Sequence, residues 1–97
     1  MSSGDDATWP RMVKLKHPVD FGKERIEELE FRRGRAGDAK GIAFGETVGG
    51  DQLNLLASRL CGQPLKVIEM LDLDDAGEVM EIALGFYRAY LGVGRKR

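Results

Sequence analysis

The chain has 97 residues, of which 42 % are hydrophobic and 32 % are charged, and its formal net charge is −1. This length suits one domain with a modest core and excludes an enzyme with a separate cofactor module, and the composition is that of a folded globular protein. The single cysteine, Cys61, and the single histidine, His17, exclude an internal disulfide and leave little for a metal site.

The N-terminus lacks the basic-then-apolar order of a signal peptide, and no apolar run approaches the roughly 20 residues that span a bilayer. We therefore expect a cytoplasmic protein that does not bind membranes. Residues 1–10 are small and polar and are predicted to form a disordered tail. Residues 11–92 are predicted to form a single domain, and residues 93–97 a basic tail.

The first part of the domain predicts a β-hairpin. Between residues 12 and 18, Val13 and Leu15 alternate with lysines, which is the two-residue period of a half-buried strand. Pro18 is predicted to end the pairing of this strand, because proline has no N–H to donate. Residues 20–23 have the composition of a turn.

A second strand follows, in which Leu29 and Phe31 alternate with charged residues. Ile26 has the opposite parity. Either a bulge lies near residues 27–28, or Ile26 packs on the other face of the strand. A helix over residues 24–31 is the alternative to this strand.

Two short helices and one longer helix are predicted before the final one. Asp38 is placed to cap a short helix that runs through Phe44, and a glycine-rich loop follows. Asp51 is predicted to cap the next helix, which Gly62 and Pro64 end. Pro64 then opens a short helix carrying three apolar residues, Leu65, Ile68 and Leu71.

The final helix is predicted to begin at Asp72 and Asp75, whose carboxylates suit a helix N-terminus, and to end near Leu91. One stripe on this helix recurs every three or four residues: Val79, Ala83, Phe86, Tyr87 and Tyr90. Its apolar residues spread over roughly 200° of the helix, which exceeds what one core requires. We interpret the surplus as a surface that contacts a partner.

The sequence offers no catalytic constellation. His17 is expected at a strand edge, and Cys61 is expected at a helix C-terminus, where the helix dipole disfavours a thiolate. Asp72, Asp74 and Asp75 lack the spacing of a calcium loop and are interpreted as helix caps. We expect no enzymatic activity, no cofactor and no bound metal.

Three arginines at the end of the second strand, Arg32, Arg33 and Arg35, could contact phosphate. The glutamates between residues 24 and 30 dilute this positive field. A small regulatory domain that binds nucleic acid through these arginines is therefore the alternative function, and it is not the one that we expect.

Two patterns together point to a known family. The first is the strand Ile-x-x-Leu-x-Phe-Arg-Arg at residues 26–33, which is followed by Gly37-Asp38. The second is Leu71-Asp72-x-x-Asp75, which leads to Gly85-Phe86-Tyr87. In this order they resemble the small tail assembly chaperones of Mu-like and related long-tailed phages, the tail protein E type, over roughly residues 12 to 87. The glycine-rich insert at residues 45–50 departs from the family pattern.

The resemblance implies a non-enzymatic phage or prophage protein that is needed while the tail is built and is absent from the finished virion. Such chaperones coat the tape-measure protein, a long helical chain, and are displaced as tail-tube subunits polymerise around it. The partners that it implies are the tape-measure protein and the tail-tube protein. The surplus apolar surface of the final helix would also fit a second copy of the chain.

Taken together, these patterns predict an α+β domain in which an N-terminal two-stranded β-hairpin packs against three or four short α-helices. The predicted core consists of Val13, Leu15, Leu29, Phe31, Leu53, Leu56, Leu60, Ile68, Val79, Ala83 and Phe86. The predicted partner-binding residues are Ile82, Leu84, Leu91, Leu65, Arg32 and Arg33.

Overall fold

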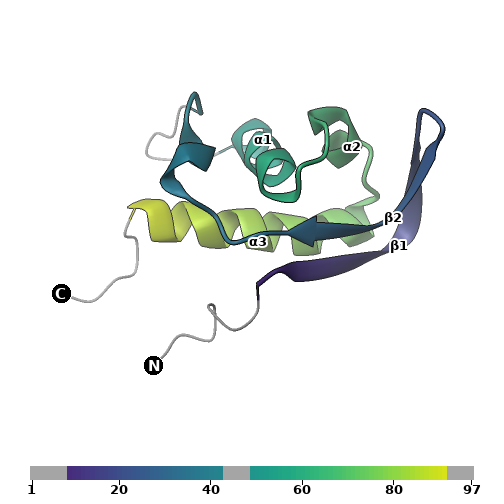
Figure 1. The fold of residues 1–97 in the computed structure, drawn as a ribbon, viewed down its shortest axis with the longest axis horizontal. Helices are drawn as coiled ribbons and strands as arrows, with labels where there is room; N and C mark the ends of the chain where they lie inside the picture. Colours follow the sequence, from purple (N-terminus) through teal and green to yellow (C-terminus); the bar gives the residue numbers. More distant parts are fainter. Residues whose placement is uncertain (1–8, 43–48, 92–97) are drawn as a thin grey trace.

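The computed structural model describes residues 9–42 and 49–91. Its elements follow in the order β1 (Arg11–Phe21), β2 (Glu24–Phe31), the short 3-10 helix η2 (Ala36–Ala39), α1 (Gly50–Cys61), α2 (Leu65–Glu69) and α3 (Leu73–Leu91). The two strands form an antiparallel hairpin beside the helices (Figure 1). This arrangement confirms the predicted α+β fold.

The hairpin is interrupted in its middle. Arg11 to Lys14 pair with Phe31 to Glu28, and pairing resumes only at Val19, opposite Ile26. Residues 15–18 of β1 therefore lie opposite the single residue 27 of β2, and the distal part of the hairpin bends away (Figure 1). The prediction that Pro18 ends the pairing is wrong, because β1 continues to Phe21 beyond this irregularity.

The irregularity explains why Ile26 is buried although it breaks the alternation set by Leu29 and Phe31. It lies next to residues 27–28, as in the first of the two alternatives for Ile26, and both Ile26 and Val19 are buried in the core. The alternative of a helix over residues 24–31 is wrong, since these residues form β2. Gly22, in the turn, has a φ of 64°, a conformation that residues with a side chain rarely adopt.

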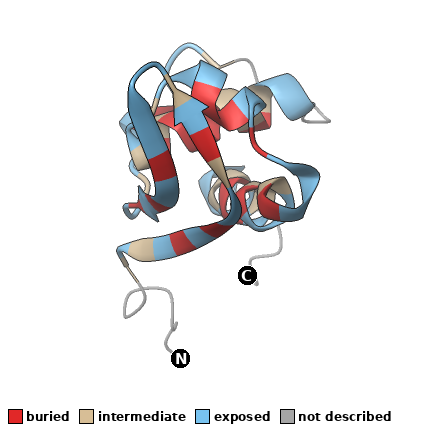
Figure 2. Ribbon diagram, turned by 90° about the vertical axis from the view of Figure 1, so that its right-hand side faces the viewer, coloured by how far each residue is buried: buried red, intermediate tan, exposed pale blue. Residues whose placement is uncertain are grey.

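One core lies between the hairpin and the helices, and Figure 2 shows buried residues alternating with exposed ones along the strands. All the predicted core residues are buried except Phe86, which is half-buried and packs against the core. The core also contains buried residues that the prediction omitted: Val19, Ile26, Ala57, Val67, Leu71 and Ile82. Trp9, which was assigned to the N-terminal tail, packs against this core.

The helix ends follow local chemistry, with one correction. The cap of α1 is Gly49, not Asp51, and Gln52 Oε1 accepts a hydrogen bond from the Gly49 N–H at 3.0 Å. Gly62 ends α1 in the left-handed conformation with a φ of 73°. At the start of α3, Asp72 Oδ1 accepts a hydrogen bond from the Asp74 N–H at 3.0 Å, as expected for a cap.

The segment around Asp38 differs from its prediction. Asp38 lies inside the short helix η2 rather than at its start, and η2 ends at Ala39. Ile42 follows as irregular chain and packs against the core. Phe44 and most of the glycine-rich loop lie outside the described residues.

Helix α3 packs against both α1 and β1, so it is buried on more than one side. This double packing accounts for much of its wide apolar arc. Ile82 is only 3 % exposed and belongs to the core, and Leu84 is half-buried and packs against it. The assumption that Ile82 forms part of an exposed surplus is therefore wrong, because one helix here faces two neighbours.

Candidate functional site

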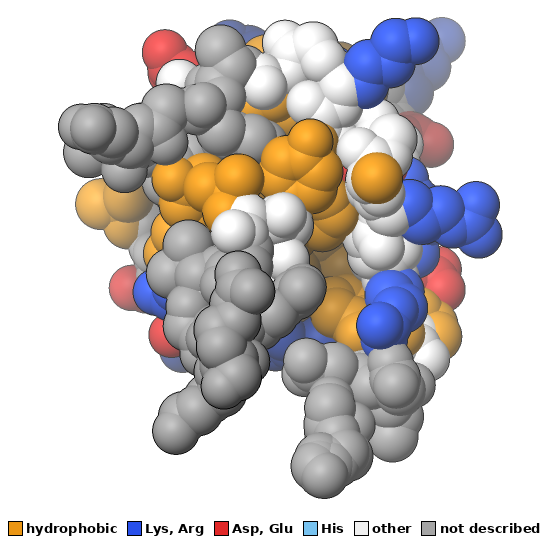
Figure 3. All heavy atoms as spheres, turned by 90° about the vertical axis from the view of Figure 1, so that its left-hand side faces the viewer, with side chains coloured by type: hydrophobic (Ala, Val, Ile, Leu, Met, Phe, Trp, Pro, Cys, Tyr) orange, Lys and Arg blue, Asp and Glu red, His pale blue; other side chains and the backbone are white. Residues whose placement is uncertain are grey.

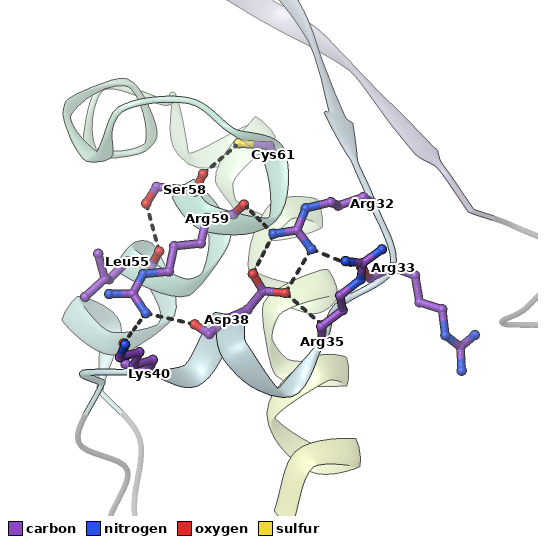
Figure 4. Close-up of polar contacts among 9 residues, drawn as sticks. All are labelled: Arg32, Arg33, Arg35, Asp38, Lys40, Leu55, Ser58, Arg59 and Cys61. Carbon is purple, nitrogen blue, oxygen red and sulfur yellow. Dashed lines mark hydrogen bonds and ion pairs between the residues drawn. The ribbon is translucent and has the colours of Figure 1, made fainter.

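The chain that follows β2 is held by an ion pair between Arg32 and Asp38 (Figure 4). Arg32 Nη1 and Nη2 donate hydrogen bonds to Asp38 Oδ2 and Oδ1 at 2.9 and 2.5 Å. Asp38 Oδ2 also accepts a hydrogen bond from the Arg35 backbone N–H at 2.7 Å. The Asp38 side chain is 10 % exposed, so this two-pronged pair fixes the 32–38 segment in one geometry.

The same segment is tied to α1. The Arg32 backbone N–H donates to the Leu60 carbonyl at 3.2 Å, and its guanidinium reaches the Arg59 carbonyl at 3.3 Å. The Arg59 side chain extends the other way, donating from Nη1 to the carbonyls of Asp38 and Lys40. Sequence reasoning did not single out Arg59, because nothing local to α1 shows that its partners lie about twenty positions earlier.

A second anchor joins α3 to the interrupted part of β1. Asp75 is 4 % exposed, and its two carboxylate oxygens accept hydrogen bonds from the backbone N–H groups of Lys16 and His17 at 2.8 and 2.9 Å. These N–H groups lie where β1 loses its pairing with β2, so Asp75 replaces the missing strand acceptor. Asp75 was predicted to be a helix cap, but its side chain accepts hydrogen bonds from β1 instead.

Both anchoring carboxylates are stabilised in their charged form. The hydrogen bond from Arg32 lowers the pKa of Asp38 and raises the pKa of Arg32. Burial raises the pKa of Asp75, but the N–H groups of Lys16 and His17 outweigh it, so the pKa of Asp75 is also lowered. Burial raises the pKa of the Cys61 thiol, which disfavours a reactive thiolate there.

The lowered pKa values of Asp38 and Asp75 predict that the folded domain loses stability at acidic pH. A carboxyl group whose pKa is lower in the folded state contributes stability above its unfolded pKa of about 3.9, and that contribution is lost as the pH falls through the folded pKa. We expect the urea midpoint to fall as the pH drops below about 4. The fall should be smaller in the Asp38→Asn variant. Equal falls in both proteins would show that Asp38 does not contribute.

Beside the second anchor, three exposed side chains come together. His17 Nε2 lies 3.2 Å from Asp74 Oδ2 and 3.8 Å from Asp72 Oδ1, and the possible ligand atoms all lie within 4.8 Å of one another. The sequence did not predict this grouping, because the histidine is far from the aspartates along the chain. Asp72 Oδ1 already accepts the helix-capping hydrogen bond, and exposed groups of this kind are common without a cation.

Arg32, Arg33 and Arg35 of the predicted arginine patch are all exposed, but they do not act as three equivalent charges. Arg32 is engaged with Asp38, whereas Arg33 lines an open pocket with Trp9 and residues of α3. The charge of Arg32 is therefore offset within the fold. This arrangement weakens the case for a phosphate-binding site built from Arg32, Arg33 and Arg35.

The predicted partner-binding residues on the helices divide between the two ends of the molecule. Leu65 on α2 is 37 % exposed and Leu91 on α3 is 45 % exposed. Helix α2 lies beside the start of α3, and Leu91 is the last residue of α3 (Figure 1). These two residues therefore do not share one surface.

The exposed apolar surface at the end of α3 extends the core stripe. Val79 and Ala83 are fully buried, Phe86 is half-buried, and Tyr90, one turn further on, is 48 % exposed. The rings of Phe86 and Tyr90 stack with their centroids 5.9 Å apart. Together with Leu91 they form what we call the distal α3 surface, and Figure 3 shows hydrophobic side chains gathered at this end of the molecule.

The Phe86 ring packs against the backbone of Gly34, in the segment that follows β2. A Cβ atom at position 34 would lie 2.1 Å from Phe86 Cδ2, so the ring rests directly on the backbone there. The arginine anchor therefore also positions Phe86, since Gly34 lies between Arg32 and Asp38.

Residues 12–88 match the family model of the phage tail assembly chaperone proteins E, 41 or 14. The chain belongs to this family. The match confirms the resemblance noted in the sequence. No curated protein and no solved structure matches the chain.

In this tail assembly chaperone, the two sequence patterns that resemble the family correspond to the two anchors. Arg32 and Asp38 belong to the first pattern, and Asp75 belongs to the second. Their contacts are internal to the domain, so these residues maintain the fold. Within residues 9–42 and 49–91, no helix has the length and apolar character needed to cross a membrane.

Proposed function

We propose that this chaperone binds the tape-measure protein while the tail is built, in the cytoplasm of the bacterial host, and leaves before the virion is complete. We also propose that it catalyses no reaction. Membership of the family supports a role in tail assembly with protein partners. The observation that favours a helical partner is the distal α3 surface.

This surface has the character of a helix-binding site. Tyr90 and Leu91, in the last turn of α3, are each nearly half exposed, and Leu73, in the first turn at the other end of the helix, is 87 % exposed. Exposed apolar side chains that cluster on one face are typical of contact sites, and an amphipathic helix is a common occupant. The tape-measure protein, which the family resemblance describes as a long helical chain, fits this requirement.

The test is co-expression of tagged chaperone with the tape-measure protein, comparing the wild type with a Tyr90→Asp, Leu91→Asp double variant. We expect the double variant to retain the fold and to recover at least about tenfold less tape-measure protein, because it removes the apolar contacts at the centre of the site. Leu91 is a cleaner probe than Leu84, because Leu84 packs against the core.

The matched control carries Leu65→Asp and Met70→Asp, which change exposed apolar residues at the other end of the molecule. This control should bind as the wild type does. Equal binding by all three proteins would contradict a role for the distal α3 surface. Loss of binding in the control alone would place the interface near α2.

A further inference from the structure

A groove opens on α3 next to the distal α3 surface. It lies between the start of β1 and the segment that follows β2. These two segments diverge from each other (Figure 1), and residues of α3 form the base of the groove. Gly85 and Ala89 line it from α3, Gly34 lines it from the opposite segment, and Phe86 and Trp9 contribute aromatic walls. Phe86 is thus shared between the groove and the distal α3 surface.

Gly85, like Gly77 on the same helix, is not required by the packing of the domain, but only Gly85 lines the groove. It lies inside an α-helix, where glycine is about 1 kcal/mol less favourable than alanine. Its φ is not positive, and a Cβ atom added there would meet nothing within 4 Å. A side chain at this position would occupy only the groove. The glycine keeps the groove open at a cost to the helix.

The residues of α3 that line the groove follow the axis of the helix. Glu81, Gly85 and Ala89 all line it and follow one another at four-residue intervals, so they form a line along α3. At a rise of about 1.5 Å per residue, this line spans roughly 12 Å, or about two turns of α3. Small residues at a helix surface allow a second helix to approach closely, as they do wherever helices pack at short distance.

The charges around the groove favour an acidic flank on its occupant. Among the described residues that line it, Arg11 and Arg33 are basic and Glu81 on α3 is the only acidic one. The Arg11 guanidinium lies 6.0 Å from the centre of the Trp9 ring, so its charge is held at the edge of the apolar walls. A carboxylate next to an apolar anchor would meet this positive edge.

We infer that the groove binds an amphipathic helix of the tape-measure protein, which places a large apolar side chain over Gly85 and an acidic residue near Arg11. This inference rests on the proposed function and specifies the contact. It places the tape-measure helix alongside the second half of α3, in contact with both the groove and the distal α3 surface.

The test places a large side chain at the base of the groove, on α3. Gly85→Leu should preserve the fold, because leucine favours helix and its side chain meets open space. The matched control is Gly77→Leu, at an exposed glycine on the same helix that also has open space above it and does not line the groove. Recovery of co-expressed tape-measure protein is expected to fall at least about tenfold for Gly85→Leu and to stay unchanged for Gly77→Leu.

A second variant covers the case in which Gly85→Leu fails to fold. Ala89→Leu also narrows the groove, from an exposed position near the end of α3, and should reduce recovery in the same way. Normal binding by folded Gly85→Leu or Ala89→Leu would overturn the groove assignment while leaving the proposed function intact. No binding by the wild-type protein would refute the proposed function itself.

The affinity and salt dependence of an Arg11 variant test separately whether the partner carries an acidic residue at this position. We expect Arg11→Gln to weaken binding several-fold and to make it less sensitive to added salt, because one charge contact is lost. Unchanged affinity and salt dependence would exclude an acidic flank on the partner. If groove-filling variants alter sedimentation of the chaperone alone, but not its recovery of tape-measure protein, the occupant is a second copy and the inference is wrong.

Discussion

Asp75→Ala is expected to lower the free energy of unfolding by about 2 to 6 kcal/mol, the sum of about 1 to 3 kcal/mol for each of two N–H groups left without an acceptor. Those groups belong to Lys16 and His17, in the part of β1 that has no strand partner. Because small domains are stable by only about 5 to 15 kcal/mol, this one change could remove much of the total. Urea unfolding followed by circular dichroism would measure it.

Two comparisons separate this contact from the general effect of removing an acidic residue. Asp75→Asn keeps one oxygen acceptor and should cost about half as much. Asp74→Ala removes an exposed neighbour whose side chain contacts only His17 among the residues described, and should change stability by less than about 1 kcal/mol. If Asp74→Ala and Asp75→Ala proved equally destabilising, Asp75 would not be an anchor.

Asp38→Ala is expected to destabilise the domain by about 3 kcal/mol, near the lower end for breaking a buried ion pair. The lower end applies because the Arg32 side chain is 49 % exposed and can turn to water once its partner is gone. The Arg35 N–H also loses its acceptor. Guanidinium chloride would screen the pair, so unfolding should be measured in urea.

The domain offers a control pair of the same chemistry on its surface. Arg25 and Asp20 lie 3.5 Å apart with side chains that are 59 % and 73 % exposed. Asp20→Ala should therefore change stability by no more than about 1 kcal/mol. A double-mutant cycle on Arg32 and Asp38 should give a coupling energy of at least about 1 kcal/mol, and a coupling near zero would show that the pair does not hold the segment.

Local patterns were sufficient to predict most of the fold. The alternation around Val13 and Leu29 predicted the hairpin, and the helical spacing of Leu53, Leu56 and Leu60 predicted α1. These patterns succeed because each element buries one face, and burial leaves a period in the sequence. The parity change at Ile26 gave an irregularity near residues 27–28 as one of two alternatives, and the structure has one there.

The errors about the anchors and about α3 share a physical cause, which is that tertiary contacts decide what these residues do. Asp75 looks like a helix cap from its neighbours, but it binds a strand that is 58 and 59 residues earlier. Ile82 looked like surplus because a single core was assumed for α3, whereas α3 packs against α1 and β1. Arg32 looked available to a partner because its pairing with Asp38 depends on how the intervening chain turns.

The partner surface was predicted only in outline. The sequence predicted a partner surface on the last helix, and this stays a prediction; periodicity alone could not show that burial decreases along the stripe from Val79 to Tyr90. The groove depends on where the strands part above Gly85, which is a tertiary feature. A glycine inside the helix was not a sufficient signal in the sequence, because Gly77 shares this feature and does not line the groove.

Hydrogen exchange on the chaperone, alone and in complex with the tape-measure protein, tests most directly whether the second half of α3 is the binding site. The account predicts slower exchange on binding in peptides that cover residues 81–91, and little change in peptides that cover α2. Slower exchange confined to residues 65–70, or to the distal part of the hairpin, with none at residues 81–91, would contradict it.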